Sequence, residues 1–257
     1  MHNRKLIRIA IALLIPAISF AQQGKKDIYA EPENLKVLPK DISPHDLSAT
    51  MKGFALGLGV RCETCHVGEK GKPLRTFDFA SDKKAMKKKA RVMWNMVQEI
   101  NTRLVPKLDE IETAERVPVR CVTCHRGQRQ PKLIEDVLDE QLAKGGKQAA
   151  LEKYAELRKQ YYGSHSYDFS EFTLPIYAQG LAKKGKIEPA IALVEINAAH
   201  FPDSFYTAFS LAEMYQNSGN KEQAITSYRK AQKLNPRAKA FIESKIAKLQ
   251  AREGKPD

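Results

Sequence analysis

The sequence contains four cysteines, and all four lie in two copies of one short pattern. Cys62-Glu-Thr-Cys65-His66 and Cys121-Val-Thr-Cys124-His125 each place two thiols three residues apart, followed at once by an imidazole. Side chains at this spacing on a helical turn share one face, so both thiols can reach the two vinyl groups on one edge of a porphyrin. The next residue can then bring its imidazole to the iron. The pattern predicts two covalently attached c-type haems, bound by Cys62, Cys65, Cys121 and Cys124 and ligated by His66 and His125.

Disulfides and a zinc site are the alternatives for cysteines in an oxidising compartment. A zinc ribbon has roughly 15 to 20 residues between its two cysteine pairs. Here the far longer segment from His66 to Arg120 separates the motifs. The spacing therefore disfavours zinc.

The first 21 residues have the pattern of a cleaved signal peptide. Basic residues precede an apolar run from Ile9 to Phe20, and Ser19 and Ala21 are the small residues expected before a cleavage site. An uncleaved membrane anchor is the alternative, but this run is shorter than the roughly 20 apolar residues that span a bilayer. We expect cleavage after Ala21 and a periplasmic location.

The chain is strongly basic. Its formal net charge is +13, and it falls to +10 when residues 1–21, which carry three basic and no acidic residues, are removed. Nucleic acid is the usual partner of such charge in a cytosolic protein. For an exported chain we expect no nucleic acid, and instead a redox partner protein that is acidic or membrane-bound.

The remaining sequence predicts a mainly α-helical fold with little regular sheet. Residues 22–134 contain both motifs and are the predicted dihaem domain, and residues 135–170 read as a helical linker with a break at Gly145-Gly146. Residues 171–257 are predicted to form tetratricopeptide-like repeats with a capping helix over residues 238–251. A period of 34 residues relates Gly185 to Gly219, Ala190 to Ala224, Ile191 to Ile225 and Pro202 to Pro236. Such repeats suggest a further protein partner.

Two methionine-bearing helices are candidates for the sixth iron ligand. The pair Ser43-Pro44 predicts the start of a helix that ends near Gly57 or Gly59, with Met51 in the middle of its apolar stripe. A second helix is predicted from near Ser81-Asp82, with Met93 central on its apolar face and Met96 one turn further on a neighbouring face. Methionine is a soft axial donor, although a methionine on an apolar stripe is more often core packing. Spacing alone does not separate Met93 from Met96.

At these residues a family resemblance becomes visible. The segments LGVRCETCH, FDFASD, KKARVMWNMVQEIN and CVTCHRGQRQP resemble the cytochrome c subunit of bacterial photosynthetic reaction centres, over roughly residues 35–132 and one haem pair of that family. The resemblance implies that Met51, eleven positions before Cys62, and Met93, eight positions before Asn101, are axial ligands, and that Met96 is not. The chain departs from the family in having two motifs instead of four, no lipid-anchoring cysteine, and added repeats.

The function we expect is electron transfer by two His/Met-ligated haems, without chemistry on a substrate. The alternative is a dihaem enzyme of the peroxidase type, or a haem sensor, with one exchangeable axial site. A basic run on the second methionine helix suggests a docking patch for an acidic redox partner, and a solvated helix face is the alternative. The run consists of Lys83, Lys84, Lys87, Lys88, Lys89 and Arg91.

Overall fold

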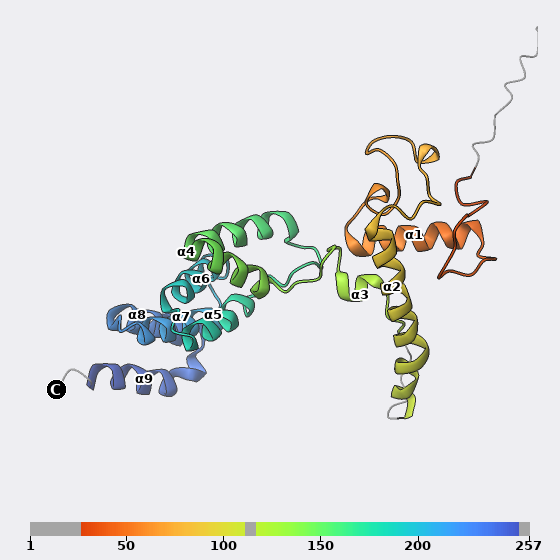
Figure 1. The fold of residues 1–257 in the computed structure, drawn as a ribbon. Coiled ribbons are helices and arrows are strands. Elements are labelled where there is room, and N and C mark those ends of the chain that lie inside the picture. The colour runs from red at the N-terminus through yellow and green to blue at the C-terminus, as the bar shows by residue number, and fades with distance from the viewer. Residues whose placement is uncertain (1–26, 111–116, 252–257) are drawn as a thin grey trace, which may run out of the picture.

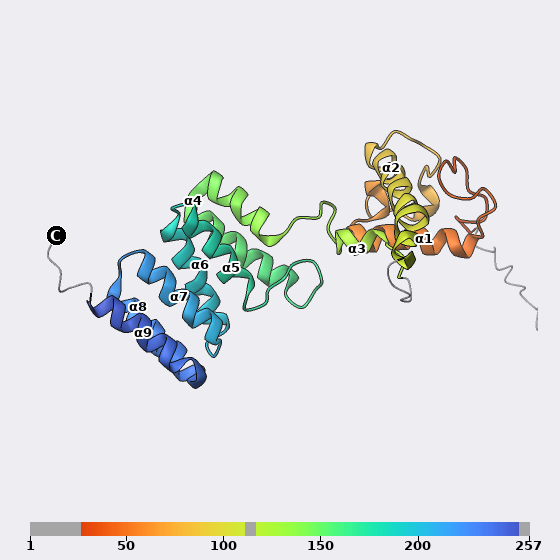
Figure 2. The same ribbon diagram turned by 90° about the horizontal axis from the view of Figure 1, so that it is seen from below.

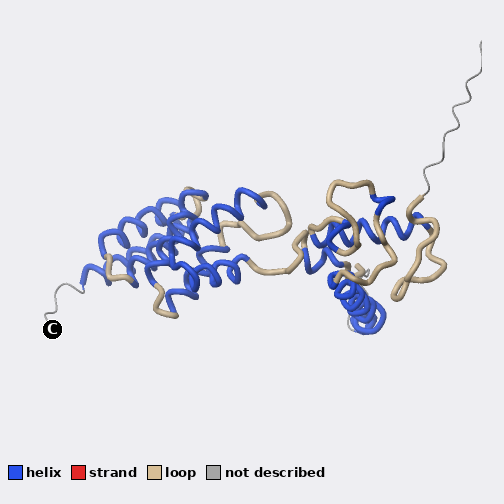
Figure 3. Tube along the Cα trace, turned by 45° about the horizontal axis from the view of Figure 1, so that its top comes forward, coloured by secondary structure: helices blue, strands red, loops and turns tan. Residues whose placement is uncertain are grey.

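A computed structural model describes residues 27–110 and 117–251. These residues are mainly helical and include no β-strand (Figure 3), which confirms the predicted fold class. Their nearest approach to a sheet is one isolated antiparallel bridge between Val67 and Asp78. The chain forms an N-terminal part with helices α1 to α3 and a C-terminal part with helices α4 to α9 (Figure 1). The predicted signal peptide lies outside the described residues.

Helix α1, Pro44–Leu58, begins and ends where the sequence predicts. Ser43 is its N-cap, since the side chain accepts a 3.1 Å hydrogen bond from the backbone nitrogen of Asp46. Gly59 closes the helix in the left-handed region, with a φ of 61°. A glycine there carries no Cβ penalty, so the chain can turn sharply at once.

Helix α2, Ala85–Glu99, begins later than the predicted Ser81-Asp82. The Asp82 carboxylate does not cap this helix, because it accepts hydrogen bonds from Asn34, Lys36 and Arg91. Helix α2 crosses α1 (Figure 2), and Trp94 packs edge-on against Phe54 with ring centroids 5.4 Å apart. A π-turn at Ile100–Leu104 and a 3-10 turn at Val105–Glu110 continue the helix. The third helix of this part, α3, is short and spans Cys121–His125.

The C-terminal part consists of helices packed side by side. They are α4 (Ile134–Tyr161), α5 (Thr173–Lys183), α6 (Ile187–His200), α7 (Phe205–Asn217), α8 (Lys221–Leu234) and α9 (Lys239–Ala251). Helix α4 is broken at Gly145 and Gly146, as predicted, where Gly146 has a φ of 66°. No helix in the described residues is long and apolar enough to cross a membrane.

Helices α6 and α8 reproduce the period seen in the sequence. Their first residues, Ile187 and Lys221, are 34 positions apart, and so are their last residues, His200 and Leu234. Gly185 and Gly219 precede them in the left-handed region, with φ values of 76° and 79°. The helix pairs therefore repeat in space with the predicted offset, while their assignment to the tetratricopeptide class stays a prediction.

Asn197 is a buried polar residue on α6, 34 positions before Ala231 of α8. Its amide nitrogen donates 2.8 Å hydrogen bonds to the Glu171 carbonyl oxygen and to Thr207 Oγ1. Buried polar groups are stable only when they are hydrogen-bonded. This asparagine therefore connects the start of α5 to α7 by hydrogen bonds that alanine cannot make.

The segment predicted as a linker packs within the C-terminal part. Leu138, Tyr154 and Leu157 of α4 are almost completely buried, in one apolar cluster with side chains of α5 and α6. A second cluster joins α7 and α8 to the capping helix α9 through Ile242, Ile246 and Leu249. Helix α4 thus shares an apolar core with α5 and α6, next to the second core of α7 to α9.

The N-terminal part has almost no apolar core of its own. Between residues 27 and 133, Leu47 and Phe77 are the only buried hydrophobic side chains in the described residues, whereas twenty-three lie between Ile134 and Leu249. A domain of this size must bury apolar surface to offset the conformational entropy of folding. Something other than side-chain packing has to supply that burial.

Candidate functional site

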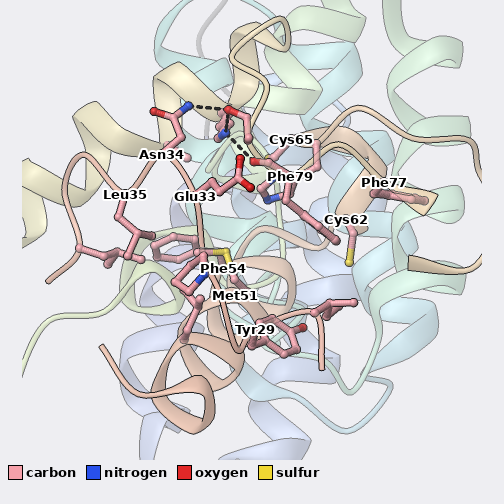
Figure 4. A pocket seen from close by; sticks show the side chains of 18 of the residues that line it. Tyr29, Glu33, Asn34, Leu35, Met51, Phe54, Cys62, Cys65, Phe77 and Phe79 are labelled. Carbon is pink, nitrogen blue, oxygen red and sulfur yellow. Dashed lines mark hydrogen bonds between the residues drawn. The ribbon is translucent and has the colours of Figure 1, made fainter. Parts of the chain in front are cut away.

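A cavity of about 450 Å³ lies in the middle of the N-terminal part. Met51 of α1 lines it together with Cys62 and Cys65 of the first motif (Figure 4). His66 of the same motif also lines it. Its other walls come from residues 28–38 and from the aromatic side chains Phe54, Phe77 and Phe79. This volume lies in the range of small-molecule and cofactor sites, roughly 300 to 1,000 Å³.

The local chain path explains how these four side chains meet. After Gly59 the chain folds back on α1, with Val60 donating from its backbone nitrogen to the Ala55 carbonyl oxygen at 3.0 Å. The first motif then forms a tight turn, in which the His66 backbone nitrogen donates to the Cys62 carbonyl oxygen at 2.9 Å. The turn after α1 thus brings both thiols to the same cavity as Met51.

His66 lies in the wall of this cavity. Its ring meets Phe79 edge-on with centroids 4.9 Å apart, and its buried Nδ1 has no hydrogen-bond partner among the described residues. Burial lowers the pKa of this imidazole, and the nearby Lys87 lowers it further. The lowered pKa favours the neutral ring, which is the form that binds a metal.

Two members of the expected docking patch are structural residues instead. Lys87 is only 9% exposed, and its ammonium donates to the carbonyl oxygens of Phe79, Ala80 and Ser81 at 2.8, 3.1 and 3.0 Å. Arg91 donates to Asp82 at 2.8 Å and to the Asn34 carbonyl oxygen at 3.0 Å. The expectation that Lys87 and Arg91 belong to an exposed basic surface is therefore wrong. The sequence of a lysine run does not show which of its side chains are buried in the folded protein.

The ion cluster around Asp82 holds one wall of the cavity. Hydrogen bonds from Lys36, Asn34 and Arg91 keep the pKa of Asp82 well below its usual range, and Lys87 adds to the effect. Folding therefore gains stability from this carboxylate at neutral pH, and that gain is lost as the pH falls through the lowered pKa. The wall joins residues 34–36 to the start of α2.

The second motif forms helix α3 and lines a smaller cavity of about 120 Å³. Cys124 and His125 lie in it with Gln128, Leu133 and Ser166. His125 Nδ1 lies 2.9 Å from the Gln128 carbonyl oxygen. A carbonyl can only accept, so Nδ1 carries the proton and Nε2 keeps its lone pair for a metal.

Asn101 positions the second motif, a role that sequence reasoning missed. Its amide nitrogen donates to the Val119 carbonyl oxygen, and its amide oxygen accepts from the Val119 backbone nitrogen, both at 2.8 Å. The Asn101 amide thus pairs with both backbone groups of Val119, as a neighbouring β-strand would. Val119 lies two positions before Cys121. The sequence marked Asn101 only as part of a motif. The signal in the sequence that could have indicated this role is the position of Asn101 directly after an amphipathic helix.

The end of α1 lies close against the second motif because α1 ends in glycines. The Gly127 backbone nitrogen donates to the Gly57 carbonyl oxygen at 2.9 Å. A Cβ on Gly59 would lie 1.9 Å from the Gly127 oxygen, and one on Gly57 would lie 3.0 Å from the Val122 nitrogen. Only glycine admits this contact. The sequence indicated these glycines as a helix end and did not show the contact.

Met93 and Met96 are not brought into either cavity. Both lie on α2 and are 40% and 49% exposed, beside Val92 at 65%. Val122 of the second motif is also exposed, at 42%. The structure thus places Met51 in one cavity with the first motif. It does not distinguish Met93 from Met96 as the candidate ligand of the second iron.

The chain was compared with known proteins. A comparison with curated proteins gives no significant match. A family model for the photosynthetic reaction centre cytochrome c subunit matches residues 4–174. The match includes helix α4 and so extends beyond residues 35–132, where the resemblance was recognised. It covers well over half of the chain. The chain therefore belongs to the photosynthetic reaction centre cytochrome c subunit family, which is a family of haem-binding electron-transfer proteins.

Proposed function

We propose that this protein is an exported, periplasmic electron carrier with two covalently attached c-type haems. The observation that carries the proposal is the 450 Å³ cavity that holds Met51, Cys62, Cys65 and His66 together. The two thiols would attach the first haem, and His66 and Met51 would ligate its iron. A His/Met pair is typical of electron-carrying cytochromes c.

The weak core of the N-terminal part supports the same proposal. Only Leu47 and Phe77 are buried hydrophobics in residues 27–110 and 117–133. A haem brings a large apolar surface, and burying such surface contributes about 25 cal/mol per Å². The prosthetic group would therefore serve as the missing core as well as the redox centre.

For the second haem, we propose attachment by Cys121 and Cys124 and ligation by His125 and Met93. The oriented ring of His125 supports this, because its Nε2 remains available. The apolar surface of Val92, Met93 and Met96 on α2 also supports it. Exposed apolar patches on soluble proteins usually mark a surface that something covers.

Bound haem iron supplies the chemistry, which is the gain and loss of one electron. The chain's own residues favour the neutral form of the His66 imidazole, orient the ring of His125, and place basic groups near both cavities. Arg61 lines the first cavity and Arg126 the second, where their guanidinium groups can neutralise haem propionates. No step on a substrate is required.

The alternative is an enzyme of the peroxidase type or a haem sensor with one exchangeable axial site. The observation that favours it is the exposure of Met93 outside both cavities. In an electron carrier both irons keep two protein ligands and are low-spin. In the alternative, the second iron lacks a fixed sixth ligand.

The test is the optical and magnetic spectrum of the purified holoprotein in both redox states, with Met93→Ala and Met96→Ala as a matched pair. We expect two low-spin haems in the unchanged protein. We expect Met93→Ala to convert one haem to high spin and Met96→Ala to leave the spectrum largely unchanged. A high-spin haem in the unchanged protein supports the alternative, and an effect of Met96→Ala alone places the ligand one turn further along α2.

An acidic redox partner is part of the proposal. Residues 22–134 contain 22 basic and 14 acidic residues, whereas residues 135–257 contain 18 and 16. The excess positive charge thus belongs to the part that carries both motifs. Lys83, Lys88 and Lys89 are exposed on or beside the first turns of α2, next to the cavity-lining Lys87 and Ala90.

We also propose a protein partner for the repeats over α5 to α8.

Electron exchange with an acidic donor should slow steeply as salt rises. We expect the double reversal Lys88→Glu with Lys89→Glu to slow association at low ionic strength, since these charges steer a partner over about 8 Å at physiological salt. The matched control is Lys230→Glu with Lys233→Glu, which makes the same change in net charge on α8. Stopped-flow reduction across ionic strengths measures the effect. Equal slowing by both double variants, or a flat salt dependence, contradicts docking at α2.

A further inference from the structure

The second motif is in contact with the C-terminal part of the chain. Two hydrogen bonds connect them: Gln128 Nε2 donates to the Ser166 carbonyl oxygen at 2.6 Å, and Ser166 Oγ donates to the Arg126 carbonyl oxygen at 2.9 Å. Gln128 and Ser166 are 9% and 8% exposed. Hydrogen bonds at such burial are shielded from competition with water.

The turn that these bonds hold is the one that orients His125. Arg126 has a φ of 47° and Gly127 a φ of 79°, and this left-handed pair returns the chain so that the Gln128 carbonyl oxygen accepts from His125 Nδ1. A non-glycine residue in the left-handed region is strained, because its Cβ lies too close to the following carbonyl oxygen. The bond from Ser166 to the Arg126 carbonyl oxygen stabilises that conformation.

Ser166 is itself fixed to the C-terminal part. Its backbone nitrogen donates to Ser164 Oγ at 3.2 Å, and Ser164 Oγ donates to the Tyr161 carbonyl oxygen at the end of α4. The next side chain, Tyr167, packs edge-on against Tyr161 with centroids 5.2 Å apart. The loop therefore moves with α4 and its core.

We infer that Ser166 is a positioning residue for His125, so that the C-terminal part of the chain completes the second haem site. The inference rests on the proposed function, since it concerns the haem that His125 would ligate. A hydrogen bond to Nδ1 makes an imidazole a stronger donor to iron, and outer partners of this kind tune metal centres. Loosening the turn weakens that bond, and the weaker donor stabilises the oxidised iron less.

The experiment is a potentiometric titration with electron paramagnetic resonance of the holoprotein carrying Ser166→Ala. We expect the midpoint potential of one haem to rise, corresponding to a several-fold change in its reduction equilibrium, with altered g-values for the same haem. The other haem should be unchanged. Ser166→Thr keeps the hydroxyl and should restore the potential. Ser218→Ala is the control, because Ser218 Oγ likewise donates to a backbone carbonyl oxygen, that of Tyr215, but does so at the end of α7.

If Ser166→Ala yields no holoprotein, Gln128→Met tests the same contact. It removes the side-chain amide that donates to Ser166, and it keeps the backbone carbonyl oxygen that accepts from His125. Unchanged potentials and g-values in either variant, with two low-spin haems present, overturn the inference and leave the proposed function standing. Equal shifts at both haems, or the same shift in Ser218→Ala, also overturn it. An unchanged protein without a second haem overturns the proposed function itself.

Discussion

Protein purified from cells that mature c-type cytochromes should keep two haems per chain after complete denaturation. Thioether bonds survive unfolding, whereas bonds from histidine or methionine to iron do not. Replacing Cys62 and Cys65 by serine should remove one of the two haems, and replacing Cys121 and Cys124 should remove the other. Intact mass of the denatured chains measures this directly. A mass equal to the bare polypeptide would contradict covalent attachment.

The two double variants should differ in stability. Cys62 and Cys65 line the 450 Å³ cavity at the centre of a part with few buried apolar side chains. Loss of that haem should leave the N-terminal part largely unfolded, since nothing else described there supplies a core. Cys124 lines the smaller cavity against the helical part. Loss of the haem bound to the second motif should therefore destabilise the fold less. Far-ultraviolet circular dichroism during heating measures the stability of the two double variants.

Replacing Lys87 by methionine should lower the free energy of unfolding by about 3 kcal/mol, whereas Lys88→Met should change it by less than about 0.5 kcal/mol. The two lysines are neighbours on α2 and differ in burial. Lys87 donates to three carbonyl oxygens, and methionine would leave them without that donor. An unsatisfied buried acceptor costs about 1 to 3 kcal/mol.

Denaturant unfolding of the two holoproteins, followed by circular dichroism, measures the difference. The optical spectrum gives a second measurement, because one of the carbonyls belongs to Phe79, whose ring packs on His66. We expect Lys87→Met to shift the bands of the first haem and Lys88→Met to leave them in place. Equal stability of the two variants would mean that Lys87 is an ordinary surface lysine.

Local features of the fold were predictable because they depend on neighbours in the sequence. Ser43 and Gly59 bound helix α1 as their cap preferences predict, and the 34-residue period reappears in the bounds of α6 and α8. The start of α2 was predicted too early. Asp82 is a good cap residue by type, but long-range bonds to Lys36 and Asn34 engage its carboxylate.

The first cavity could be anticipated because its components are close in the sequence. Met51 lies eleven positions before Cys62, and one helix and one turn bring them together. The second site was less accessible to this reasoning. Met93 is separated from Cys121 by a π-turn, a 3-10 turn and residues outside the described structure. Its ligand stays a prediction.

By itself, the sequence determined the family and the mainly helical fold and predicted the chemistry-bearing residues, because motif spacing and helical periodicity are local properties of a chain. Only the tertiary structure decided which charged groups are buried and what holds each motif. Lys87, Asn101 and Ser166 look like ordinary polar residues in the sequence. They act through backbone groups, and the backbone offers the same carbonyl and amide at every position. The partner of such a side chain is therefore set by the path of the folded chain.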